Sequence, residues 1–157
     1  MKLKTTEELI EEFGKPNEEG TPYITLIDLP YPMRLAWDTK KSVTKMRCHK
    51  KIAEPLTAVL DELLSTYGLD AIKRLEIDLF GGCFVYRKMR GGSQLSRHSW
   101  GIAIDLSPEK NGLKTPFAQS QFGQAGYKHL HDIFNKHGFL NYGVVKGYDA
   151  MHFEFAL

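Results

Sequence analysis

The 157-residue sequence has few cysteines, little net charge and no long hydrophobic run. Its two cysteines, Cys48 and Cys83, are far apart, so the chain has neither a CxxC pair nor a framework of disulfides. A formal net charge of +2 gives no reason to expect a nucleic-acid-binding protein, although mild attraction to an anionic polymer is compatible with it. No stretch approaches the roughly 18 apolar residues of a membrane span.

The N-terminus also lacks the apolar run of a secretory signal. MKLKTTEELIEEFGKP becomes acidic and helical where such a signal would be hydrophobic. We therefore expect synthesis in the cytoplasm without a signal peptide. The length and the 42% hydrophobic content fit one soluble globular domain, residues 1–157, which we expect to be a monomer.

Three segments show the apolar period or the end signals of helices. The first begins with a capping box made by Thr5 and Glu8. Between Ser42 and Tyr67 apolar residues recur at helical spacing, and Pro55 inside this span predicts a kink or a junction of two helices. A further helix of about four turns is expected over residues 124–138.

Short apolar or alternating runs predict strands between these helices. They are Tyr23–Asp38, Leu75–Phe80, CFVYRKMRGG, GIAIDL and MHFEFAL. Residues 107–123 are rich in Pro, Gly, Asn, Ser and Gln and predict a surface loop. Because there is no regular strand–helix–strand repeat, the sequence predicts an α+β fold with a small antiparallel sheet flanked by helices.

The run SRHSWGIAID places an aspartate inside an apolar strand, seven residues after a histidine. Alternation puts Asp105 on one face with Gly101 and Ala103, small residues that leave room for a ligand beside the carboxylate. His98 lies in the preceding turn and can reach Asp105. A buried acid needs an arginine, a lysine or a metal ion beside it, because an unpaired buried charge is costly.

A second run, DAMHFEF, sets Asp149 three residues before His152. In a strand, His152 and Glu154 share one face while two phenylalanines occupy the other. Two imidazoles and a carboxylate with an open fourth position are a common site for catalytic zinc, and Asp149 beside it could act as general base. From these residues alone, a metal site and ordinary ion pairing remain equally open.

SRHSWGIAIDL resembles the Ser-x-His-x-x-Gly-x-Ala-x-Asp pattern of the zinc D-alanyl-D-alanine carboxypeptidase family. DAMHFEF resembles the second element of that family, an acid followed by the last zinc-binding histidine. The resemblance covers residues 81–157 and is closest to the L-alanyl-D-glutamate endopeptidase branch of phage endolysins. It implies a fold like these peptidases and the hedgehog domain, with one zinc ion per chain bound by His98, Asp105 and His152.

The same resemblance implies roles for five other residues. Asp149 would be the catalytic base. The family places an arginine in the strand before the first motif, near the scissile carbonyl, for which Arg87 is the first choice and Arg90 the competitor. Ser96 is expected to hydrogen-bond locally or to touch substrate, and Glu154 to orient a ligand histidine from behind.

The implied activity is hydrolysis of a peptidoglycan stem peptide, at the L-Ala–D-Glu bond in preference to D-Ala–D-Ala, on the wall after release or delivery. Residues 108–124 are a candidate rim of the cleft. A non-haem iron oxygenase also uses two histidines and a carboxylate, but usually with closer spacing and without a task for Asp149. A non-catalytic zinc module of the same fold is the other alternative, and Asp149 with a candidate arginine favours the enzyme.

Overall fold

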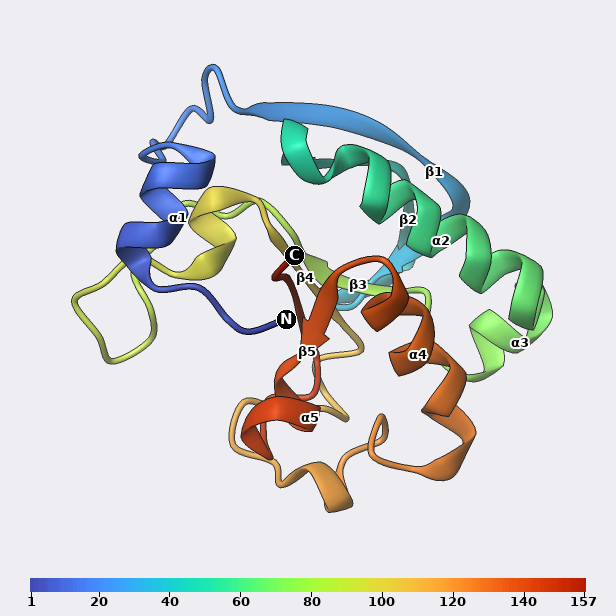
Figure 1. Ribbon diagram of the computed structural model, residues 1–157. Coiled ribbons are helices and arrows are strands. Elements are labelled where there is room, and N and C mark those ends of the chain that lie inside the picture. The colour runs from blue at the N-terminus through green and yellow to red at the C-terminus, as the bar shows by residue number, and fades with distance from the viewer.

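The computed structural model describes all 157 residues, and its six strands join in one sheet (Figure 1). In chain order the elements are α1 (Thr6–Phe13), β1 (Ile24–Leu35), β2 (Asp38–His49), α2 (Ala53–Tyr67), α3 (Leu69–Arg74), β3 (Leu79–Gly82), β4 (Ala103–Leu106), α4 (Lys128–Lys136), β5 (Phe139–Asn141), α5 (Tyr142–Lys146) and β6 (His152–Phe155). Short 3-10 turns lie at Lys50–Ile52, Arg97–Trp100, Phe117–Gln119 and Ala125–Tyr127.

The strand order across the sheet is β2-β1-β3-β4-β6-β5. All neighbouring strands are antiparallel except β1 and β3. A mostly antiparallel sheet combined with helices confirms the α+β class. Because β4 pairs with β6, the two sequence motifs that carry histidine and acid lie side by side near one end of the sheet.

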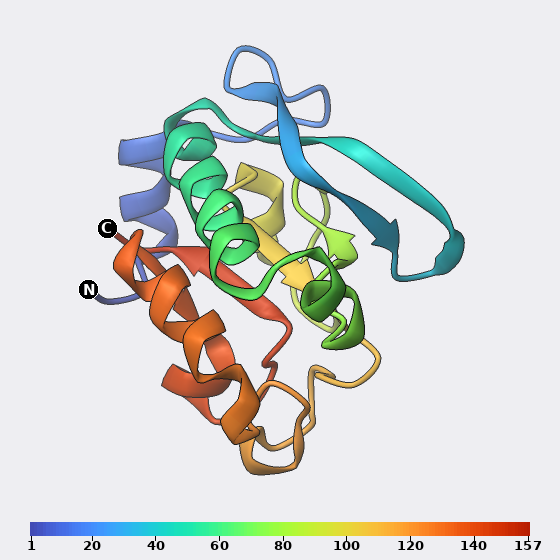
Figure 2. The same ribbon diagram turned by 90° about the vertical axis from the view of Figure 1, so that its right-hand side faces the viewer.

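Helices α2 and α4 lie next to each other against one face of the sheet (Figure 2). Ile104 of β4 and Phe153 of β6 are fully buried on this side, and the Phe153 ring stacks on Phe134 of α4 with 4.0 Å between centroids. Alternation turns the polar residues of β4 and β6 to the opposite face. No helix is both long enough and apolar enough to cross a membrane.

Several local sequence signals act as expected. Thr5 caps α1, and both hydrogen bonds of its capping box with Glu8 are present. GIAIDL and MHFEFAL form β4 and β6. The helix expected over residues 124–138 is α4, and the 3-10 turn at its start shortens the regular part.

The helix predicted from Ser42 is wrong over its first part, because this stretch forms β2. Met46 and Cys48 are buried while Arg47 between them is exposed, which is the period of a strand. The helix α2 begins two residues before Pro55. Proline is tolerated in a first turn, where its missing N–H breaks no hydrogen bond, and the helix continues unbroken to Tyr67.

Other boundaries also differ from the prediction. The strand expected over residues 75–80 begins only at Leu79, after a short α3, and CFVYRKMRGG forms no strand beyond one isolated bridge between Lys88 and Leu95. The loop at 107–123 is irregular as predicted, but it is anchored in the core by fully buried Asn111 and Phe122. The short β5 and α5 are not predicted at all.

Gly101, which joins the turn carrying His98 to β4, adopts a conformation that favours glycine. Its φ is +69°, and its N–H bonds to the His98 carbonyl. A Cβ here would lie 2.9 Å from the backbone nitrogen of His49 and 2.7 Å from Cδ1 of Ile24. This glycine is therefore required by the turn and by the close approach of β1 and β2, and not by space beside Asp105.

The substitution Gly101→Ala should lower the free energy of unfolding by about 2 kcal/mol, because it adds left-handed strain and overpacking. Urea denaturation measures this change. Gly126→Ala is the matched control, since no atom lies within 4 Å of its added Cβ and its φ is not positive. Equal stability of the two variants would contradict this account of Gly101.

Candidate metal centre

Asp105 and His152 face each other across β4 and β6. The antiparallel register pairs them directly, which brings their side chains together on the polar face. His152 Nδ1 lies 3.2 Å from Asp105 Oδ1. The strand pairing alone thus brings one residue from each motif into contact.

His98 reaches the same carboxylate from the 3-10 turn Arg97–Trp100. Ser96 caps this turn, with its hydroxyl accepting a hydrogen bond from the His98 backbone N–H at 3.3 Å. The ring Nδ1 lies 2.8 Å from the carbonyl oxygen of Cys83. A carbonyl can only accept, so Nδ1 carries the proton, and Nε2 faces Asp105 Oδ2 at 3.1 Å.

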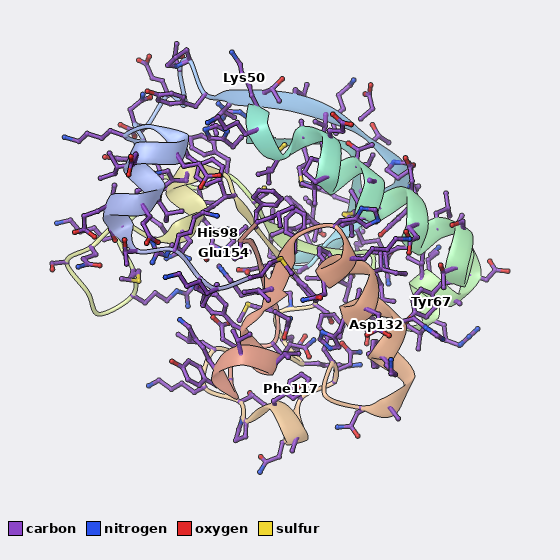
Figure 3. All side chains as sticks on the ribbon, in the orientation of Figure 1. Lys50, Tyr67, His98, Phe117, Asp132 and Glu154 are labelled. Atoms are coloured by element: carbon purple, nitrogen blue, oxygen red, sulfur yellow. The ribbon has the colours of Figure 1, made fainter.

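His152 is oriented in the same manner by Glu154, two residues along β6. Its Nε2 lies 3.0 Å from Glu154 Oε1, so Nε2 donates to the carboxylate and Nδ1 is left toward Asp105. Tyr142 of α5 donates its hydroxyl to the same Glu154 oxygen at 2.7 Å. Figure 3 labels His98 and Glu154, which lie close together near the centre of the view.

With a proton on the far ring nitrogen only, each of the two histidines directs a ring lone pair at the Asp105 carboxylate. His98 Nε2 and Asp105 Oδ1 are buried and have no hydrogen-bond partner. Ligand atoms of His98, Asp105 and His152 all lie within 4.8 Å of one another. Lone pairs that converge at such distances need a proton or a metal ion between them, and two imidazoles with one carboxylate suit zinc or ferrous iron.

The pKa values show how strongly these groups interact. Burial alone would raise the pKa of Asp105, but His98 and His152 outweigh it and hold that pKa well below its usual range. Burial alone would lower the pKa of His152, but hydrogen bonds with Asp105 and Glu154 raise it to about 9. Asp105 is thus ionised, as a metal ligand must be, and metal binding at His152 displaces a proton.

Asp149 lies in the turn that enters β6. Its φ is +61°, its main-chain carbonyl accepts a hydrogen bond from the His152 N–H at 3.2 Å, and its residue surface is 8% exposed. No protein hydrogen bond holds its carboxylate, and burial raises its pKa. The charges of all three candidate ligands act on Asp149, which places it beside the cluster.

The two candidate arginines differ in how firmly they are held. The Arg87 main chain bonds to the Ser96 N–H at 2.8 Å and to the Ser99 hydroxyl, so it is fixed to the turn that carries His98. The residue is half-buried, and its guanidinium donates only to the Lys88 carbonyl, in an exposed hydrogen bond. Arg90 is exposed in the following loop. Neither guanidinium contacts the histidine and aspartate cluster.

Three contacts behind the ligands are not predicted from the sequence. The Cys83 carbonyl is a main-chain group and has no side-chain signal. Tyr142 lies on the unpredicted α5, shortly before the second motif but outside it. Arg97 is inside the first motif, and its Nε lies 3.9 Å from Glu154 Oε2. Its position directly before His98 in the sequence is the one feature that could have indicated a role at the site.

Comparison with known proteins agrees with this geometry. A family model described as D-alanyl-D-alanine carboxypeptidase matches residues 90–155. The match covers less than half of the chain, but it contains both motifs and all three candidate ligands. It supports a metallopeptidase of this family. No curated protein and no solved structure matches the chain.

The wild-type protein should bind about one zinc ion per chain, and His98→Ala and His152→Ala should each abolish binding, because either removes a directed lone pair. Elemental mass spectrometry of protein reconstituted with zinc measures this. His129→Ala, an exposed histidine on α4, is the matched control and should retain zinc. Wild-type protein that takes up no metal would rule out the site.

Proposed function

We propose that the protein is a zinc-dependent peptidase that hydrolyses the stem peptide of peptidoglycan, with the L-Ala–D-Glu bond favoured over D-Ala–D-Ala. The observation that carries the proposal is the convergence of His98 and His152 ring nitrogens on the Asp105 carboxylate, whose Oδ1 is buried. This cluster lies within the span that matches a peptidase family. The endopeptidase preference rests on the resemblance of the motifs to the endolysin branch.

His98, Asp105 and His152 would hold the zinc ion. When bound, zinc polarises a peptide carbonyl and lowers the pKa of a water molecule to roughly 7. Asp149 takes a proton from the attacking water and returns it to the leaving amine. Its pKa is raised by burial, and its carboxylate is free of protein hydrogen bonds, which are both properties of a group available to accept and return a proton.

Arg87 is proposed to bind the carbonyl oxygen as negative charge develops on it. Its main chain and His98 belong to one hydrogen-bonded unit, so its position relative to the ligands is fixed while its guanidinium can swing toward a substrate. Arg90 is the competitor for this role. The Ser96 hydroxyl is already used in capping the His98 turn, and any contact with substrate would be additional.

Glu154 is proposed to hold His152 in the tautomer that a metal ligand needs. We propose that this activity belongs to a single domain, residues 1–157, that acts as a monomer on the cell wall, with no nucleic-acid partner. It would reach the wall by release or delivery. Residues 108–124 would form a rim of the cleft, since the Phe117 N–H bonds to the Gly147 carbonyl just before Asp149.

Asp149→Asn should retain zinc and lower kcat by about 100-fold or more, because the amide cannot accept the proton. The assay is digestion of purified peptidoglycan, with mass spectrometry of the released ends to separate L-Ala–D-Glu cleavage from loss of terminal D-Ala. Asp132→Asn, on the exposed side of α4, is the control. Normal digestion by Asp149→Asn would disprove its role as base.

A zinc-loaded wild type that releases no peptide would instead favour the non-catalytic module of the same fold. Elemental analysis of the same samples separates these outcomes, since metal content and turnover are measured independently.

Substitution of Arg87 and of Arg90 tests which arginine binds the carbonyl oxygen of the substrate. Arg87→Gln should lower kcat/KM by about 100-fold without loss of zinc, which is the usual effect of removing one donor to a developing oxyanion. Arg90→Gln should have little effect. The reverse result would assign the role to Arg90.

A further inference from the structure

We propose that Arg97 is a positioning residue of the metal centre. It would fix the Glu154 carboxylate and, through it, the ring of His152, while the main chain of Lys4 fixes Arg97. This inference rests on the proposed zinc site, but it concerns residues outside the ligand set and a segment of the chain outside the family match.

Glu154 is the acidic residue that pairs with the largely buried Arg97 side chain. Its side chain is only 21% exposed, and Nη1 is buried without a hydrogen-bond partner. Nη2 donates to the Lys4 carbonyl at 2.8 Å, and Nε lies 3.9 Å from Glu154 Oε2. Burying a guanidinium with an unsatisfied N–H is costly, so this arrangement contributes little to stability by itself.

The two oxygens of Glu154 have different partners. Oε1 accepts hydrogen bonds from His152 Nε2 and from the Tyr142 hydroxyl, while Oε2 faces Arg97. Glu154 is 1% exposed, so water cannot stabilise its charge. A histidine that binds metal is neutral, and Arg97 is the permanently charged group that can balance this carboxylate.

Arg97 also connects this carboxylate to the start of the chain. Lys4, whose carbonyl accepts from Arg97, donates its Nζ to the Leu157 carbonyl at 3.1 Å and pairs with Glu12 at 3.3 Å. The N-terminal segment therefore lies against the end of β6, near the C-terminus in Figure 1. A series of contacts thus runs from Lys4 through Arg97 and Glu154 to His152. It connects the N-terminal segment with the last strand of the sequence.

The test is zinc affinity, measured by competition with a chromophoric chelator at fixed pH. Arg97→Gln should weaken zinc binding about tenfold, the lower end of the effect of groups behind metal ligands. Thermal unfolding of the metal-free protein measures the effect on stability separately from the effect on zinc affinity. Arg97→Lys keeps the charge but cannot reach both partners, so it should lie between wild type and Arg97→Gln. Arg74→Gln, an exposed arginine on α3, is the matched control.

A double-mutant cycle with Glu154→Gln tests the route of the effect. If Arg97 acts through Glu154, Arg97→Gln should add much less than tenfold in the Glu154→Gln background. Additive effects, or wild-type affinity in Arg97→Gln, would overturn the inference while leaving the proposed zinc site standing. Wild-type protein that binds no zinc would overturn both.

Discussion

The register of β4 against β6 is the constraint on which the site depends. Asp105 faces His152 only because Ile104 pairs with Phe153 in the neighbouring position, and both of these apolar residues are fully buried. A slip by one residue would turn Asp105 into the core and expose an apolar side chain. Packing of Phe153 against Phe134 therefore determines the chemistry on the opposite face.

The ring nitrogen that each histidine directs at Asp105 is determined by a hydrogen bond on the other side of its ring. A main-chain carbonyl takes the Nδ1 proton of His98, and a carboxylate takes the Nε2 proton of His152. The two histidines consequently use different ring nitrogens toward Asp105. Ligand atoms of His98, His152 and Asp105 therefore converge on one point, where a metal ion or a proton can be held. For this reason the same residues fit both a metal site and an ion pair when only the sequence is considered.

The sequence was sufficient where the physical signal is local. Alternation along β4 and β6 gave the correct faces for Asp105, His152 and Glu154, and a capping box placed the first helix. The prediction failed where the pattern is weak or fits both a helix and a strand. The spacing of apolar residues in β2 also fits a helix, and only pairing with β1 decides between them. Contacts made by a carbonyl, or by short elements such as α5, leave no sequence pattern.

The half of the chain before the family match contains no candidate ligand, yet it holds the turn that carries His98. The Trp100 indole donates to the Gly14 carbonyl at 2.9 Å, the His49 N–H bonds to the Gly101 carbonyl at 2.9 Å, and Arg97 bonds to Lys4. These contacts come from three separate parts of the N-terminal half. Because a ligand histidine must be held within a fraction of an ångström for tight metal binding, residues far from the motifs can change the affinity of the site without touching the metal.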